Sequence, residues 1–585
     1  MLDRPLVLLF AAVLFAAVLL GACGSTPAAS ATKAVVDTVA DTVADANADS
    51  AVPVADSPEP DAPPDTGDDA QEPSAPSFCT DRGLTWEPFS SGPYGTLRHQ
   101  VAADFSLDVA DGSTWNFKEN YTGCEVTVFV TDLVPVSELN PASVWDSAKD
   151  LDTLIKKSPD NVHYFFLSLK QAAPAAAAIA AMQGRVTAAT DKLSGDAQAH
   201  WQAHLHVVAA RGQDLSNWIG KVAVSHGQIG FTIDRFQRIR GFGNLSDVTR
   251  QKPNLQAAGK WPWESNLAYA AYEAQYLNAD AALALKIKAD AGKEVPLWQG
   301  ETLAEYATAE VDLGKASDLQ GYDTLQVEVN QRCPNDDAPE LGNCGAWDYL
   351  AGLSVWDQTQ QKNIEIARFI TSYHRETHWL VDISAMQPLL AAGGKQLFRW
   401  DFAPSWNTQP TKTWLKLRFV KKNKPYRAKS LQFLWSGGDW NSKFDTLHPD
   451  QLATIPTTAK RVELWALITG HGQDPTTSCA EFCNHQHVFS VGGKEFVKDH
   501  PLAGTNNQCI PNVDKGMAPN QAGTWWFGRG GWCPGMQVEP WVADITDAVQ
   551  LGKAATVSYH GLLKGAAPPG AQGNIDGAVW LVVYE

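Results

Sequence analysis

Residues 333–357, CPNDDAPELGNCGAWDYLAGLSVWD, place two cysteines at the ends of a short acidic loop and an apolar run behind it. Trp347 and Asp348 stand between the second cysteine and that run. The run is strand-like and ends before a polar turn. If the cysteines join, the loop is covalently fixed and holds one tryptophan and one carboxylate at the start of a β-strand. We therefore interpret this stretch as part of a functional site on a β-domain.

Similar strand-like runs, such as TLQVEVNQR and RVELWALITG, continue from about residue 283 to the end of the sequence. Turns rich in Gly, Pro and Asn separate them, and convincing helical patterns are scarce. This pattern is typical of an all-β sandwich or jelly roll. Because about 300 residues exceed what one hydrophobic core usually holds, we predict two stacked antiparallel β domains, each a sandwich or jelly roll, over residues 283–423 and 424–585.

The N-terminal residues predict export and lipidation. The chain begins with a short segment that contains one arginine, and an apolar segment of signal-peptide length follows. The apolar segment ends at Leu20-Gly21-Ala22-Cys23, which resembles a bacterial lipobox. We therefore expect a signal peptide over residues 1–22 and a lipid anchor at Cys23, as the only attachment to a membrane. Gly24 is compatible with sorting to the outer membrane, so the expected location is the bacterial outer membrane or cell surface.

Residues 23–77 predict a disordered tether, because they are mostly Ala, Asp, Pro, Ser and Thr with few large apolar side chains. From Gly24 onward this segment holds nine Asp, two Glu and one Lys, which is −10 of the chain's net charge of −19. The acidity is therefore mostly a property of the tether and says little about a substrate. The sequence has no phosphate-binding loop, dinucleotide motif, zinc cluster or basic patch at useful spacing, so we expect no nucleic-acid partner.

Residues 78–282 predict a mixed α/β domain. EVTVFVTD and VHYFFLSL are typical of buried strands, 147–158 and 171–210 are helical, and DFSLDVADGSTWNF and FTIDRFQRIRGFG predict hairpins. This order resembles the thioredoxin-like fold. A redox-active member would carry a cysteine just after the first buried strand, where residues 133–137 are Leu-Val-Pro-Val-Ser. We therefore expect a structural or binding module without a redox motif.

Eight cysteines follow Cys23, an even number that favours disulfides in an exported chain. Many connectivities are possible, but their order along the chain suggests four local pairs: Cys79–Cys124, Cys333–Cys344, Cys479–Cys483 and Cys509–Cys533.

Three of these pairs would close loops that carry an ionic side chain beside aromatic residues. Asp348 follows the first loop, Glu481 lies inside the second, and Arg529 lies near the end of the third. Aromatic faces beside carboxylates are suited to sugars, and two carboxylates in different surroundings can divide the roles of acid and base. The alternative is that the disulfides are staples and the aromatic residues are core.

Three segments resemble signature segments of the peptide-N-glycosidase F family and occur in the family's order: CPNDD…CGAWDY, TGHG…CAEFC and GRGGWCPGM. ARFITSY and WLVDIS add to the resemblance, which covers roughly residues 310–585. It implies two adjacent eight-stranded jelly rolls with three local disulfides. It also implies hydrolysis of the amide between asparagine and the first N-acetylglucosamine of an N-glycan, without metal or cofactor. The expected partners are N-linked glycoproteins or glycopeptides, and we expect a monomer.

The resemblance implies that Asp348 and Glu481 are catalytic, with Asp348 as the base on water or as the attacking carboxylate. Tyr349 departs from the family, whose active members have arginine there, and Pro404 stands at the spacing of a third family acid. Asp401 is the candidate replacement for that acid. The substrate-binding residues implied by position are Trp347, Tyr349, Asp401, Trp406, His471, Phe482, Arg529 and Trp532.

Two other functions stay open. The abundance of Gly and Trp also fits a carbohydrate-binding module without catalysis. His485 and His487 alternate on a predicted strand and, with Met536, resemble ligands of copper-dependent peptide-hydroxylating monooxygenases, which share the fold. No second His-His-Met set is present in the sequence, and we expect no metal site.

Overall fold

The computed structural model describes residues 75–132, 143–225, 229–248, 268–472, 477–505, 508–520, 524–569 and 573–585. The predicted signal peptide, Cys23, nearly all of the predicted tether and residues 133–137 lie outside these ranges. The chain divides into two units after Gln71, and every described residue belongs to the second. Among the described helices, none combines the length and the apolar character needed to span a bilayer.

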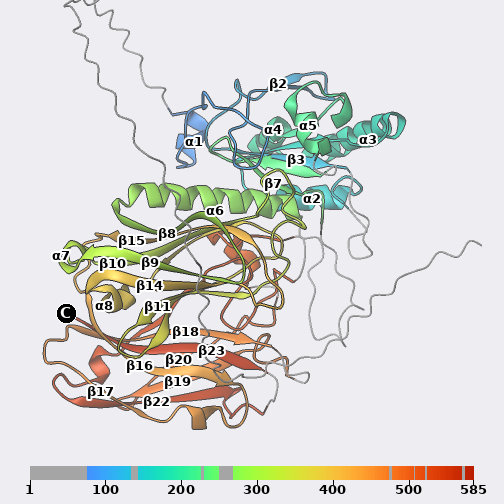
Figure 1. The fold of residues 1–585 in the computed structure, drawn as a ribbon. Coiled ribbons are helices and arrows are strands. Elements are labelled where there is room, and N and C mark those ends of the chain that lie inside the picture. The colour runs from blue at the N-terminus through green and yellow to red at the C-terminus, as the bar shows by residue number, and fades with distance from the viewer. Residues whose placement is uncertain are drawn as a thin grey trace, which may run out of the picture. The chain divides into compact units, whose positions relative to one another are not determined.

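The α/β part, in which Figure 1 labels β3 and β7, is built on a five-stranded sheet with the strand order β5-β4-β3-β6-β7. The two predicted buried strands, β3 and β4, are parallel, and successive residues enter hydrophobic cores on opposite faces of the sheet. This explains their continuous apolar sequence. The bounds are β3 Val126–Thr131, β4 Val162–Leu167, β5 Leu205–Val207, β6 Gly230–Ile233 and β7 Ile239–Gly243.

Both predicted hairpins of this part are confirmed. β1 (Ser106–Asp108) pairs with β2 (Thr114–Asn116), and β6 pairs with β7. The first turn places Gly112 at φ +94°, a conformation that favours glycine. The predicted helical region 171–210 is wrong at its end, because β5 forms there and pairs with β4 through buried apolar residues.

The helices of the α/β part include the predicted one at 147–158, observed as α2. They are α1 Ser77–Asp81, α2 Ala148–Lys157, α3 Ala172–Thr190, α4 Gly195–His204 and α5 Trp218–Ser225, with a short 3₁₀ helix, η1, at Gly212–Asp214. Helix α6, Tyr269–Ala289, contacts β3 and α2 as well as the 3₁₀ helix η6, Ile510–Lys515, of the β-rich part. The expected boundary at residue 283 therefore lies inside α6, and the first strand of the β-rich part starts only at Gly292.

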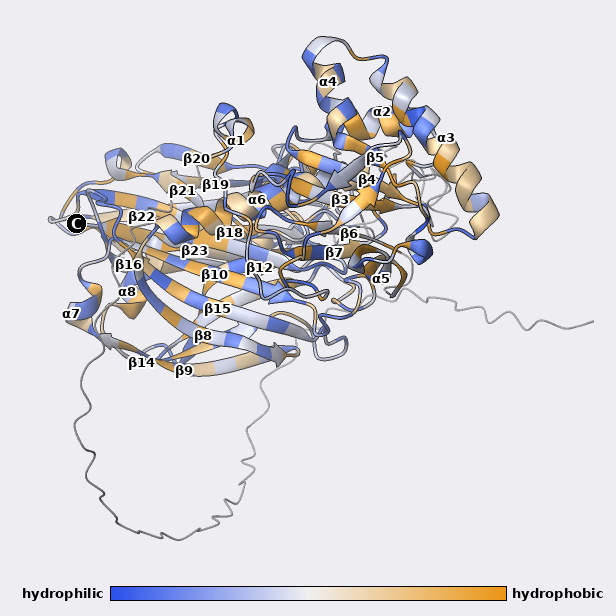
Figure 2. Ribbon diagram, turned by 90° about the horizontal axis from the view of Figure 1, so that it is seen from above, coloured by the Kyte–Doolittle hydropathy of each residue, from blue (hydrophilic) through white to orange (hydrophobic). Residues whose placement is uncertain are grey.

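The first sandwich consists of two four-stranded antiparallel sheets, ordered β13-β10-β15-β8 and β12-β11-β14-β9. Apolar and polar residues alternate along β10 and β15, so each strand turns one face to the core (Figure 2). The strands are β8 Gly292–Leu303, β9 Tyr306–Lys315, β10 Thr324–Arg332, β11 Leu350–Asp357, β12 Lys362–Ile370, β13 Thr377–Asp382, β14 Gly393–Asp401 and β15 Thr411–Val420. Short helices follow β9 and β13: α7 Ala316–Leu319, η4 Ser384–Met386 and α8 Gln387–Leu390.

The second sandwich has the sheets β16-β23-β18-β21 and β17-β22-β19-β20. The strands are β16 Ala428–Asp439, β17 Gln451–Thr454, β18 Arg461–His471, β19 His485–Val491, β20 Lys494–Lys498, β21 Trp541–Asp544, β22 Ala554–Leu563 and β23 Asn574–Tyr584. Its 3₁₀ helices are η5 Phe444–Leu447, η6 Ile510–Lys515 and η7 Thr546–Ala548. The two predicted eight-stranded antiparallel sandwiches are confirmed, and the expected division near residue 423 lies between β15 and β16.

The two sandwiches share a hydrophobic interface. β18 is buried along nearly its whole length because its alternate residues face different cores. Leu464 and Ala466 belong to the core of the second sandwich, whereas Trp465 and Leu467 join the core of the first. The continuous apolar sequence RVELWALITG thus marks a strand that is covered on both faces.

Candidate active site

The first cysteine loop holds Asp348 from both sides. The predicted disulfide Cys333–Cys344 is present, and Thr371, at the end of β12, fixes the backbone that follows it. The Thr371 hydroxyl donates to the Trp347 carbonyl at 2.7 Å and accepts from the Tyr349 amide at 2.8 Å. Asp348 therefore projects from a backbone whose two neighbouring residues are both bonded.

The second loop fixes Glu481 equally closely. The predicted disulfide Cys479–Cys483 encloses it. The Glu481 amide donates to the Gly472 carbonyl at 2.9 Å, and its carbonyl accepts from the Gly530 amide at 2.6 Å. A Cβ at Gly530 would lie 2.7 Å from the Ala480 carbonyl oxygen of the second loop and 2.2 Å from His485 Nε2 on β19, so this close approach requires glycine.

The third loop, closed by Cys509–Cys533 as predicted, carries Arg529, whose side chain is 1% exposed. Its Nη1 donates to the carbonyls of Thr524 and Phe527 at 2.9 and 2.8 Å, and its Nη2 donates to the Thr524 hydroxyl at 3.0 Å. These bonds set the plane of the guanidinium. The remaining donors face the two carboxylates.

Arg529 brings the two predicted acids together. Its Nη2 donates to Asp348 Oδ2 at 3.2 Å, and its Nε donates to Glu481 Oε1 at 3.3 Å. The side chains of Asp348 and Glu481 are 16% and 19% exposed. Two partly accessible carboxylates from different sandwiches thus bind the same buried guanidinium. Its positive charge reduces the repulsion between them.

Tyr373 completes this group and was not predicted as a site residue. It is 8% exposed, and its hydroxyl accepts from Arg529 Nη2 at 3.3 Å and donates to Asp348. Burial raises the pKa of Tyr373 well above its ordinary value, so it stays a proton donor. The only sequence signal was its place in ARFITSY, whose resemblance to the family assigns no role to this residue.

The electrostatics of the two acids suit proton transfer. Burial raises the pKa of Glu481 to about 7, with the charge of Asp348 adding to this and Arg529 opposing it. Burial also raises the pKa of Asp348, against the effect of Arg529. Two interacting carboxylates with raised pKa values can hold one proton between them near neutral pH. This is the arrangement by which one acid is ionised while its neighbour is protonated.

We expect the stability of the fold to depend on pH through Glu481. Its folded pKa of about 7 exceeds the ordinary 4.5, so the folded state keeps a proton that the unfolded chain releases. The resulting stabilisation is complete below pH 4.5 and is lost as pH rises through 7. Glu481→Gln should therefore flatten the pH dependence of the free energy of unfolding, by up to roughly 1.4 kcal/mol per unit of pKa shift.

Urea unfolding at pH 5 and pH 8 tests this prediction, with Glu495→Gln as the control because Glu495 is exposed on β20. The prediction would be contradicted if the free energy of unfolding changed by the same amount between pH 5 and pH 8 in the parent protein and in Glu481→Gln.

Three of the predicted sugar-contacting residues form an exposed rim beside Asp348. Trp347 is 52% exposed and Trp406 is 77% exposed, which is unusual for tryptophan. The Tyr349 ring meets Trp406 edge-on at 5.8 Å, and its hydroxyl accepts from Asn407 Nδ2 at 2.7 Å. Tyr349 therefore ties the 404–407 turn to the chain that carries Asp348, at the position where the family has arginine.

Two other predicted residues, Phe482 and Trp532, lie against Arg529, and a third, His471, packs on Trp532. Phe482 and Trp532 are 9% and 5% exposed, and their ring centroids lie 5.5 and 4.8 Å from the guanidinium carbon. His471 stacks on Trp532 at 5.1 Å, and burial lowers its pKa to about 4. Their observed contacts therefore support the cation, and their expected role as substrate contacts stays a prediction.

Asp401 binds a neighbour on its own strand. It ends β14 opposite Gly352 of β11, and Arg399 binds both of its oxygens, at 2.8 and 2.7 Å. This ion pair is its observed side-chain contact, and its expected role as the replacement acid stays a prediction.

Two histidine clusters were considered as metal sites. Nitrogens of His485, His487 and His500 lie within 4.8 Å of one another, and burial lowers the pKa of all three rings. His485 and His487 bond to each other at 2.7 Å, and Met536 packs against the hydrophobic core that contains β3 and β4. The expectation that these residues bind no metal stays a prediction.

The second cluster lies in the α/β part. His163 and His204 face one oxygen of Glu125, with their Nε2 atoms at 3.4 and 2.9 Å from it. Their rings are stacked at 4.3 Å with an interplanar angle of 16°. Both rings direct Nε2 at the same oxygen, and burial lowers the pKa of His163. In this structure the three groups form a hydrogen-bonded cluster, and the expectation of no metal site stays a prediction.

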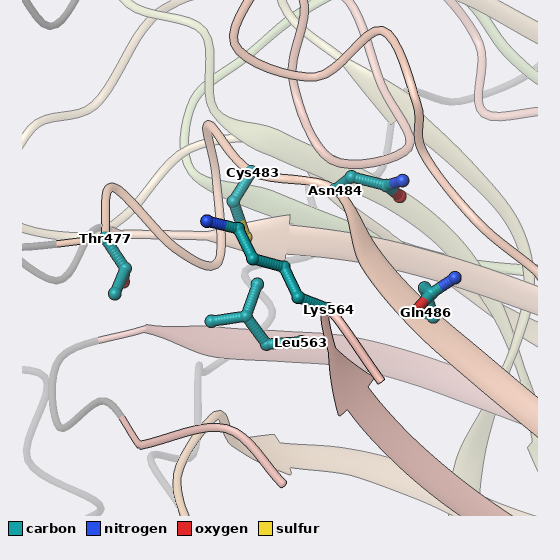
Figure 3. Close-up of a pocket in the computed structure, with 6 residues that line it drawn as sticks. All are labelled: Thr477, Cys483, Asn484, Gln486, Leu563 and Lys564. Atoms are coloured by element: carbon teal, nitrogen blue, oxygen red, sulfur yellow. The ribbon is translucent and has the colours of Figure 1, made fainter. Parts of the chain in front are cut away.

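A cavity of about 450 Å³ borders the loop that carries Glu481. Figure 3 shows Lys564 extending over it towards Cys483, the second cysteine of that loop. Its lining combines polar groups with one leucine: Thr477, Cys483, Asn484, Gln486, Leu563 and Lys564. Its polar groups could bind hydroxyl groups of a ligand, while Leu563 and the aliphatic part of Lys564 offer apolar contact.

Known proteins match the β-rich half of the chain. Residues 439–583 match the family model "Peptide-N-glycosidase F, C terminal". The peptide-N(4)-(N-acetyl-β-D-glucosaminyl)asparagine amidase F of Elizabethkingia miricola is 24% identical over 259 residues, 42% of this chain and 69% of that protein.

Two solved structures are also similar. PNGase F, a glycosylasparaginase from Flavobacterium meningosepticum, has 18% identity and a TM-score of 0.39 over 50% of this chain and 96% of its own. PNGF-II has 12% identity and a TM-score of 0.37 over 60% of this chain and 74% of its own. These structural scores are low, so the relationship rests on the two sequence matches.

Proposed function

We propose that this chain, whose β-rich half is related to the peptide-N-glycosidase F family, removes N-glycans by hydrolysing the amide between asparagine and the first N-acetylglucosamine. The sequence relationship supports an amidase-like hydrolase. The observation that carries the proposal is the single buried Arg529 that holds Asp348 and Glu481 side by side, each partly open to solvent.

The chemistry follows from these groups. Asp348 takes a proton from water, and the water oxygen adds to the amide carbon. The carbon–nitrogen bond then breaks, and the nitrogen leaves protonated on the sugar as a glycosylamine, which later loses ammonia. The peptide keeps aspartate. A direct attack by Asp348, followed by hydrolysis of the resulting anhydride, gives the same products.

Glu481 and Arg529 would lower the barrier in different ways. With a pKa of about 7, Glu481 can hold the proton that the departing nitrogen needs. Arg529 keeps its charge and lies within reach of both acids, so it stabilises negative charge that develops beside them. Tyr373 orients Asp348 with its hydroxyl.

The sugar would bind at the exposed rim. The rings of Trp347 and Trp406 can pack on the C–H faces of N-acetylglucosamine, and the cavity beside Lys564 can receive further sugars. The rings stand beside Asp348, so a bound sugar would bring its glycosylamide to the two acids. We infer that Tyr349 shapes this rim in place of the family's arginine.

The remaining assignments belong to the same proposal. The chain would be exported as a lipoprotein anchored at Cys23, with residues 23–77 as a tether at the bacterial outer membrane or cell surface. N-linked glycoproteins or glycopeptides would be its partners. The strand order of the α/β part supports a thioredoxin-like module, here without redox chemistry.

A carbohydrate-binding protein without catalysis is the second candidate, favoured by the same exposed tryptophans. The two candidates differ in whether the glycopeptide is cleaved. We expect the full chain, incubated with a denatured N-glycoprotein, to convert glycosylated asparagine into aspartate, as read by mass spectrometry of the peptides. Retained glycan with measurable binding would instead identify a binding protein.

A further inference from the structure

The connection between β12 and β13, residues 371–376, joins the candidate active site to the α/β part. Its first residues face the site: Thr371 fixes the backbone beside Asp348, and Tyr373 contacts Arg529. Its last residues, Arg375 and Glu376, bond to α6 and to the α/β part. One short segment thus touches both the reacting groups and a separate part of the fold.

Glu376 is a buried carboxylate shared by the first cysteine loop and the α/β part. Its Oε1 accepts from the Cys333 amide at 3.0 Å and from Arg98 Nη1 at 2.6 Å, and its Oε2 lies 2.7 Å from His99 Nε2. Arg98 is 1% exposed and also donates from Nη2 to the Asn335 carbonyl at 2.5 Å. A single arginine of the α/β part therefore binds the loop directly and binds the carboxylate that holds the base of the loop.

Arg375 connects the first and third cysteine loops. Its Nη1 and Nη2 donate to the two oxygens of Glu273 on α6, at 2.7 and 2.8 Å. Its Nε donates to Glu340 in the first loop, and its Nη1 donates to the Pro519 carbonyl in the third loop at 2.6 Å. Because all these groups are buried, removing one leaves its partners uncompensated.

Apolar packing adds to these bonds. The Tyr272 ring on α6 meets Trp525 of the third loop edge-on at 5.7 Å. Cys509 and Val513 of that loop belong to the same hydrophobic core as β3 and β4. The loop that carries Arg529 therefore packs on the α/β part as well as on its own sandwich.

We propose that the α/β part is a structural half of the active site and that Arg98 is a positioning residue for the Asp348–Arg529 pair. Each disulfide fixes the shape of its own loop, but none joins one loop to another. The second and third loops also bond directly through the Gly530 amide and the Glu481 carbonyl. The position of the first loop relative to the third depends further on residues 371–376, Arg98 and α6, which bond to both. This inference rests on the proposed amidase function for its kinetic consequence only.

Replacing Arg98 tests the inference in the full chain. We expect Arg98→Met to lower kcat by about 10²-fold, the size of effect that a misplacement of about 1 Å can produce, with little change in KM. Hydrogen–deuterium exchange should rise in peptides from 333–348 and 371–376 and stay unchanged in β18 and β23. Arg98→Lys keeps a cation beside Glu376 and should recover part of both effects.

Arg235→Met is the matched control, because Arg235 is a buried arginine of the same α/β part that donates to the Thr85 carbonyl. It should lower the melting temperature without changing kcat or exchange in the two loop segments. The exchange measurement needs no activity, so it tests the positioning role even if the parent protein cleaves no glycan. Unchanged exchange in Arg98→Met, or equal effects of Arg98→Met and Arg235→Met, would overturn the inference.

Discussion

Asp348→Asn will lower kcat/KM for a glycopeptide by about 10³-fold, within the range expected when a general acid–base group is removed. Asparagine preserves the shape of the side chain but cannot take a proton from water or attack the amide as a carboxylate. The backbone on either side is fixed by Thr371, so the loop should keep its conformation. Steady-state kinetics with a fluorescent glycopeptide measure the effect, and circular dichroism checks the fold.

Asp348→Asn should also change the pKa of the neighbouring Glu481. The charge of Asp348 helps to raise the pKa of Glu481 to about 7, so its removal should shift this pKa down and move the residual pH profile to lower pH. Asp357→Asn is the control, because Asp357 is the acid of a second Trp-Asp pair and accepts from the Thr359 and Gln360 amides in a turn. We expect Asp357→Asn to keep the activity of the parent protein. If Asp348→Asn were as active as this control, Asp348 would not be the catalytic carboxylate.

Arg529→Lys will lower kcat by about 10²-fold, comparable with the loss of one donor that stabilises developing negative charge. A lysine is a point charge and cannot donate in one plane to both carboxylates and to the backbone carbonyls. Arg529 opposes the raised pKa values of Asp348 and Glu481, so a weaker cation should raise both further. The acidic limb of the kcat/KM profile should therefore move to higher pH.

Arg399→Lys is the matched control for this second prediction. Arg399 binds the oxygens of Asp401 on β14, whereas Arg529 binds Asp348 and Glu481. We expect the replacement of Arg399 to leave the pH profile unchanged. A profile that moved equally in both variants would show that Asp401 acts together with Asp348 and would contradict the specific role of Arg529.

The parts of the fold that local sequence controls were predictable. The strand-like runs of the β-rich half were predictable because each strand buries alternate residues or, as in β18, both faces. The disulfides were predictable because each joins cysteines that are near in the sequence. α6 differs, because its pattern continues past residue 282 without a breaker, and the expected domain boundary therefore fell inside the helix.

The three charged residues of the site could be predicted because each lies at or inside a cysteine loop. Tyr373 could not, because it sits at the end of a strand and its role depends on a loop 156 residues away. Asp401 was a candidate only because it is the acid upstream of Trp406 in a segment where Pro404 has the family's spacing, and nothing in the sequence indicates that Arg399 binds it. Long-range contacts such as Arg98 with Glu376, 278 residues apart, leave no periodic pattern.

The most direct test of the proposed function is peptide mass spectrometry after incubation of a defined N-glycopeptide with the full chain in heavy-oxygen water. Hydrolysis of the glycosylated amide predicts that the peptide loses its whole glycan and carries aspartate with one heavy oxygen, and that Asp348→Asn gives no such product. A peptide that keeps its glycan, or keeps the first N-acetylglucosamine on asparagine, would contradict the account.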